Sequence, residues 1–114
     1  MDKHSPAPLI QRPRRNRRTP AIRDLVAETH FSARQLIMPL FIIPGKGKRV
    51  AIASMPGIEQ LSIDQAAEEI ETGLQLGLTN FLLFGIPTYK DGEGSAAWQA
   101  DGIIQQALRQ FTEK

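Results

Sequence analysis

The stretch LTNFLLFGIP, from Leu78 to Pro87, decides the fold of this chain. It is short and almost wholly apolar, and a helical pattern leads into it. Such a run predicts a strand that is buried on both faces, as in the parallel sheets of α/β proteins. Because the carboxyl ends of parallel strands open onto the substrate crevice, Phe84 and Gly85 are expected on the side where chemistry occurs. A plain place in the hydrophobic core is the alternative interpretation of Phe84.

A second apolar run, LIMPLFII from Leu36 to Ile43, predicts another buried strand. Pro39 lies in its middle and lacks a backbone N–H, so a bulge or an edge position is expected there. The long connection from Pro44 to Leu61 could form a small hairpin. Beyond the second strand, residues 86–100 read as a loop with a turn at Asp91.

Three helices are predicted from capping residues and apolar spacing. Thr19 as N-cap and Pro20 in the first turn start a short helix over Ala21 to Glu28. Ser62 and Gln65 have the spacing of a capping box, which predicts a helix that continues until Gly77. A last helix is expected after Asp101 as its cap, with apolar positions from Ile103 to Phe111.

The order of these elements indicates an α/β fold with a parallel sheet, because strands alternate with helices. Two strands cannot complete such a sheet, and a TIM (β/α)8 barrel uses ~250 residues in eight such units. The chain is therefore expected to hold a basic N-terminal arm with a short helix, residues 1–34, and the opening, incomplete part of a barrel, residues 35–114.

Composition narrows the classes of protein that fit. The chain has 114 residues, 41% of them hydrophobic and 23% charged, and no cysteine. It therefore offers no disulfide and no thiolate metal site. No apolar run approaches the ~20 residues that span a bilayer, and the start lacks the apolar segment of a secretory signal. A cytoplasmic protein without membrane contact is expected.

Positive charge gathers in the arm. Residues 1–34 hold eight Lys or Arg against three acids, whereas the remainder holds six against nine. Such a segment can attract nucleic acid or dock on a neighbouring subunit. The residues concerned are five arginines, Arg12, Arg14, Arg15, Arg17 and Arg18, and the apolar face of the short helix, Ile22, Leu25 and Val26.

Several motifs, in order, resemble the start of the delta-aminolevulinic acid dehydratase (porphobilinogen synthase) family. They are RPRRNRRTPAIRDLVAET at 12–29, LIMPLFII at 36–43, IASMPGIEQLSID at 52–64, and LFGIP followed by KDGEGSAAW and ADGIIQQAL between 83 and 108. Each motif is weak alone, and their order and spacing carry the match. One departure is Gln99-Ala100, where many relatives have Asn-Pro; it affects only a loop.

The resemblance implies a TIM barrel whose N-terminal arm wraps a neighbouring subunit in a large homo-oligomer, typically an octamer. It implies the condensation of two 5-aminolevulinate molecules to porphobilinogen in heme biosynthesis, through two Schiff-base lysines, with zinc, magnesium or both in the complete enzyme. The family's lysines and metal ligands match no residue here, so the segment alone is expected to be inactive. By resemblance, only Phe84 belongs to the substrate pocket, as an aromatic wall.

Two hypotheses from other classes stay open on the sequence alone. One is a small module whose basic arm binds nucleic acid, although no aromatic residues alternate with the arginines and no reading helix of known type is present. The other is a truncated assembly partner without activity that docks on a full-length enzyme.

Overall fold

The computed structural model describes residues 14–113 and divides the chain into two compact units, Met1–Phe31 and Ser32–Lys114. The first unit contains a 3-10 helix, η1 (Arg14–Arg17), and helix α1 (Pro20–Val26). Thr19 caps α1 as predicted, because its side-chain oxygen accepts a hydrogen bond of 3.2 Å from the Ile22 N–H. The helix ends two residues earlier than predicted.

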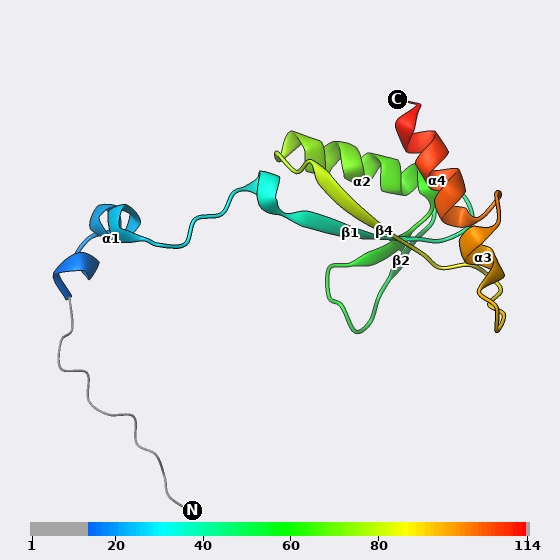
Figure 1. Cartoon of the computed structure of the whole chain (residues 1–114), viewed down its shortest axis with the longest axis horizontal. Helices are drawn as coiled ribbons and strands as arrows, with labels where there is room; N and C mark the ends of the chain where they lie inside the picture. The colour runs from blue at the N-terminus through cyan, green and yellow to red at the C-terminus, as the bar shows by residue number, and fades with distance from the viewer. Residues whose placement is uncertain (1–13, 114) are drawn as a thin grey trace, which may run out of the picture. The chain divides into compact units, whose positions relative to one another are not determined.

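The second unit is a four-stranded sheet with helices on one face (Figure 1). A 3-10 helix, η2 (Ala33–Gln35), precedes it. The strands are β1 (Ile37–Ile42), β2 (Arg49–Ala51), β3 (Glu59–Leu61) and β4 (Asn80–Gly85), and the helices are α2 (Ile63–Gln75), α3 (Ser95–Trp98) and α4 (Ile103–Thr112). The sheet order is β2-β3-β1-β4. Among the described residues, no helix is long and apolar enough to cross a membrane.

The two predicted strands pair in parallel along their whole length, from Ile37 opposite Asn80 to Ile42 opposite Gly85. The predicted hairpin forms between β2 and β3. β3 also pairs in parallel with the carboxyl end of β1, and no pattern in the sequence indicates this second pairing. β1 is therefore a central strand.

Of the two positions expected for Pro39, the bulge is wrong, because the register of β1 with β4 is unbroken. The edge position is confirmed locally, although β1 as a whole lies between β3 and β4. The backbone groups of alternate residues point to the same edge of a strand. Since the Ile43 N–H donates to Leu61 O, Pro39 faces the β3 edge as well. The pairing with β3 covers only Phe41 and Ile42, so the N–H that proline lacks has no ladder partner there.

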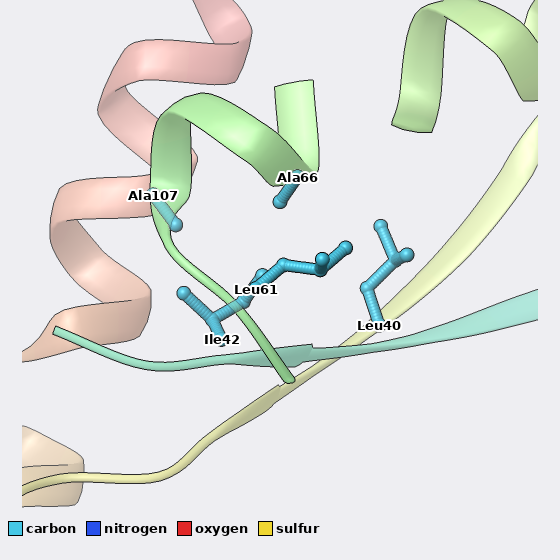
Figure 2. Packing of buried hydrophobic residues seen from close by; sticks show 5 residues of the cluster. All are labelled: Leu40, Ile42, Leu61, Ala66 and Ala107. Atoms are coloured by element: carbon cyan, nitrogen blue, oxygen red, sulfur yellow. The ribbon is translucent and has the colours of Figure 1, made fainter. Parts of the chain in front are cut away.

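The core lies between the sheet and helices α2 and α4. Its buried members come from two strands and both helices, and Figure 2 shows their side chains on the same side of β1: Leu40, Ile42, Leu61, Ala66 and Ala107. Phe81 and Leu83 of β4 pack against this cluster. The prediction that β4 is buried on both faces is wrong within the described residues, because the helices cover only one face. Leu82 and Phe84, on the other face, are 50% and 45% exposed.

The predicted end of α2 at Gly77 is confirmed, because Gly77 follows the C-cap Leu76 with a φ of 87°, and the Gly77 and Leu78 N–H groups donate to Leu74 O and Gly73 O. The other two cap predictions are wrong. Ser62 is the N-cap of α2, but its hydroxyl caps no helix N–H, and the Gln65 side chain accepts from Arg49 instead, so there is no capping box. The N-cap of α4 is Gly102 and not Asp101. Residues 86–100, expected to be a loop, also contain the short helix α3, because the glycines before it indicated a loop.

Candidate active site

Two phenylalanines stack at the carboxyl ends of the parallel strands. Phe41 of β1 is the register partner of Phe84 of β4. Their ring centroids lie 5.4 Å apart and their planes are inclined by 19°. This spacing lies in the range that aromatic pairs prefer.

Strand geometry decides which way these rings point. Successive side chains of a strand alternate between the two faces of the sheet. Leu40 and Ile42 enter the core, so Phe41, which lies between them, is on the opposite face. Leu83 packs against the core, so Phe84, the next residue, is also on the opposite face. No described helix covers that face. The pair is thus an apolar aromatic surface at the end of the sheet where α/β proteins bind ligands.

A cleft of about 340 Å³ lies beyond the end of β4. Its walls come from the residues that follow the strand, from α3 and from the first turn of α4: Gly85, Pro87, Tyr89, Lys90, Asp91, Gly94, Ala96, Ala97, Ile103, Ile104 and Gln105. The Gln105 Nε2 donates to Ala97 O at 2.7 Å, while its Oε1 is buried without a partner in the described residues. A second hollow, of about 400 Å³, adjoins it and reaches Pro44 and Gly45 after β1.

The loop after β1 is tied to the start of α2. The Gly47 N–H donates to Asp64 Oδ2 at 2.8 Å, and the Lys48 N–H donates to Ser62 Oγ at 2.9 Å. The Ser62 hydroxyl donates to Asp64 Oδ1 at 2.6 Å. The hydroxyl of Ser62, together with the Gly47 N–H, lowers the pKa of the Asp64 carboxyl. Ser62 is therefore a buried clamp for this loop, a role that sequence spacing alone does not reveal.

A second aspartate shapes the loop after β4. Asp91 Oδ1 accepts from the N–H groups of Ser95 and Glu93, at 2.9 and 3.2 Å. The Ser95 side chain and these backbone donors lower the pKa of the Asp91 carboxyl. An ionised carboxylate thus holds the turn that lines the cleft.

The lysines are not placed for Schiff-base chemistry. Such a lysine needs a desolvated or cationic setting that favours the neutral amine. Lys46, Lys48 and Lys90 are all exposed, and Lys3 and Lys114 lie outside the described residues. His30 is exposed, and His4 also lies outside the described residues.

Residues 14–113 contain no group of three or more His, Cys, Asp or Glu side chains arranged to hold a metal ion. A group of glutamates surrounds Arg49 of β2, whose guanidinium lies 3.1 Å from Glu59 and 3.4 Å from Glu69. These contacts, with Glu59 first, raise the pKa of Arg49. Because its carboxylates face an arginine, this group is an ion-pair network on the helix side of the sheet, and the described residues do not fit a metal site.

The predicted arm residues share one small unit. Arg14, Arg15, Arg17 and Arg18 are exposed, and Arg12 lies outside the described residues. On α1, Leu25 is 84% and Val26 45% exposed, while Ile22 is half-buried. Within this unit, an apolar helix face thus accompanies a run of cations.

Phe41 is the residue that sequence reasoning missed. The alternation within LIMPLFII was an available signal, because it places Phe41 opposite Leu40 and Ile42. Its pairing with Phe84 depends on the register of β1 and β4, which no local pattern encodes.

Comparison with known proteins identifies the family. The sequence model described as "Delta-aminolevulinic acid dehydratase" matches residues 10–114. The delta-aminolevulinic acid dehydratase of Halalkalibacterium halodurans is 46% identical over 104 residues, 91% of this chain, and that of Synechococcus elongatus is 45% identical over 90% of it. The porphobilinogen synthase of Toxoplasma gondii, solved with its product porphobilinogen, superimposes with a TM-score of 0.77 at 32% identity and covers 93% of this chain.

The chain matches only part of the length of each relative. The chain spans 32% and 31% of the length of the two curated relatives and 30% of the solved T. gondii chain. Its parallel β1 and β4, with α2 and α4 on one face, fit two βα units of the TIM barrel expected from the sequence. On the agreement of sequence, fold and spacing, this chain belongs to the delta-aminolevulinic acid dehydratase family.

Proposed function

We propose that this chain supplies the opening strands and an aromatic wall of the substrate pocket of a porphobilinogen synthase. In this proposal the complete enzyme condenses two 5-aminolevulinate molecules to porphobilinogen in heme biosynthesis, in the cytoplasm. The observation that carries it is the half-exposed Phe84 ring, stacked on Phe41 at the carboxyl ends of two parallel strands. The T. gondii relative, solved with porphobilinogen, supports the choice of substrate class.

In this proposal, the Schiff-base lysines and the metal ligands belong to parts of the complete enzyme outside this segment. The exposed Lys46, Lys48 and Lys90 are assigned no Schiff base, so the segment itself contributes no catalytic residue. Zinc, magnesium or both serve the complete enzyme, held by residues outside this segment. Phe84 contributes an apolar surface for the carbon chain of the substrate and excludes water beside it.

We infer a separate role for the arm. Leu25 and Val26 expose apolar surface beside a run of arginines, which is the chemistry of a docking helix rather than of an isolated surface helix. In this proposal Ile22, Leu25 and Val26 pack on another subunit, and the five arginines pair with its acidic groups, giving a homo-oligomer such as an octamer. The nucleic-acid-binding hypothesis explains neither the Phe41–Phe84 pair nor the family match, and no observation on the described residues favours the assembly-partner hypothesis.

The proposal is tested in a chimera in which residues 10–114 of this chain replace the matching segment of the H. halodurans relative. The purified chimera is incubated with 5-aminolevulinate, with zinc or magnesium added in separate reactions, and porphobilinogen is measured by its colour reaction with an aromatic aldehyde. The same relative without the segment is the control. We expect product from the chimera and none from the control. A folded chimera that forms no porphobilinogen would overturn the proposed function.

A further inference from the structure

Phe41 lies between a polar and an aromatic neighbour in one row across the sheet. Its register partners are Gln60 of β3 on one side and Phe84 of β4 on the other. Phe41 is half-buried, whereas Phe84 is 45% exposed. Phe41 is therefore the inner ring of the stack, and Phe84 presents the larger free surface.

The stack matters because the Phe84 ring is half-exposed. Within the described sheet, the strand neighbour of Phe84 is Phe41. A half-exposed ring can occupy more than one rotamer, and ordering it costs conformational entropy. The stack with Phe41, at a centroid distance of 5.4 Å, limits the Phe84 ring to orientations nearly parallel to its partner.

We propose that Phe41 is a positioning residue, which holds the Phe84 ring in the orientation that receives the substrate and thereby sets the affinity for 5-aminolevulinate. This role rests on the proposed function of the segment. An apolar wall contacts the carbon chain equally in the ground state and the transition state. Loss of such uniform binding raises KM and leaves kcat nearly unchanged.

The test uses the chimera with Phe41→Leu, which keeps an apolar side chain and removes the ring stack. We expect KM for 5-aminolevulinate to rise about 2- to 12-fold, which is the interaction free energy of one aromatic pair converted to a ratio of affinities. We expect kcat to stay within about twofold. Phe41→Tyr keeps the stack and should restore KM. The matched control is Phe81→Leu, the same change on the helix-covered face of β4, which should lower the thermal midpoint without moving KM.

A second pair of variants asks whether Phe41 acts through Phe84. If it does, Phe41→Leu should change KM in the presence of Phe84 and have no further effect in a Phe84→Ala background. An equal rise of KM in both backgrounds, or a rise in neither with only stability lost, would overturn the positioning role. An inactive unsubstituted chimera would overturn the proposed function and this role together, whereas additive effects in an active chimera would overturn this role alone.

Discussion

Gly85 and Ile103 approach each other so closely that there is no room for a side chain at position 85. A Cβ on Gly85 would lie 2.8 Å from Ile103 Cγ2, and equally close to Ile104 Cγ1. This contact joins the end of β4 to the first turn of α4, directly after Phe84. The absence of a side chain at position 85 therefore decides how near the helix lies to the aromatic wall.

Gly85→Ala should push α4 away from β4. We expect the chimera to lose about 1–3 kcal/mol in its free energy of unfolding, the usual cost of overpacking, measured as a lower thermal midpoint. Gly92→Ala is the matched control, because a Cβ there meets nothing within 4 Å, and it should stay within about 0.5 kcal/mol. Equal stability of the two variants would show that α4 does not depend on this contact.

Asp64 should make the protein sensitive to acid. Hydrogen bonds to its carboxylate lower its pKa in the folded state, so its stabilising effect is present above the ordinary value of about 3.9 and is lost as the pH falls through the lower folded pKa. Asp64→Asn should lower the thermal midpoint near neutral pH, and the difference from the unsubstituted chimera should shrink below pH ~4.

Asp101→Asn is the control for that experiment, since the Asp101 carboxylate accepts no hydrogen bond from residues 14–113. Its effect on the thermal midpoint should be small throughout. A deficit of Asp64→Asn that stays constant down to pH ~2 would contradict the role of the ionised carboxylate, because at that pH most ordinary aspartates are protonated.

Phe84→Ala should lower kcat/KM for 5-aminolevulinate by about tenfold or more, because an apolar pocket that loses a large group loses a corresponding part of its binding energy. Phe81→Ala removes the same ring from the other face of β4 and serves as control for lost stability. Unchanged kinetics in folded Phe84→Ala would mean that Phe84 is an ordinary packing residue.

Deleting everything before residue 29 from the chimera should give a smaller assembly, because the proposed docking helix and arginines are removed. Sedimentation velocity of the chimera measures the change. Leu25→Ala with Val26→Ala should weaken the assembly in the same direction, and Asp24→Ala, on the opposite side of α1, should not. A full-size oligomer after the deletion would contradict the proposed role of the arm.

The 114 residues alone should form no covalent adduct with 5-aminolevulinate. Exposed ammonium groups stay hydrated and protonated, and Phe84 has no opposing wall in the described residues. The purified chain is incubated with substrate, with and without zinc and magnesium, trapped with borohydride and analysed by mass spectrometry. A stoichiometric adduct on Lys46, Lys48 or Lys90, together with porphobilinogen, would refute both this prediction and the placement of the catalytic residues outside the segment.

Local patterns in the sequence were sufficient where one element decides its own conformation. The runs 36–43 and 78–85 form strands, the spacing after Ser62 forms α2, and Thr19 caps α1. Capping predictions failed where a polar side chain had a stronger partner in space. Ser62 and Gln65 bond to the loop and strand before α2, because hydroxyl and amide groups satisfy whichever donor or acceptor the fold brings within reach.

The sequence by itself determined the alternation of strands and helices, the apolar character of β1 and β4 and the place of Phe84 at a strand end. Only the tertiary structure decided that β3 joins β1, that Pro39 faces an unpaired edge, and that Phe41 stacks on Phe84. The physical reason is that periodicity and capping act over a few residues, whereas register joins segments about forty residues apart and is settled by packing the whole sheet against its helices.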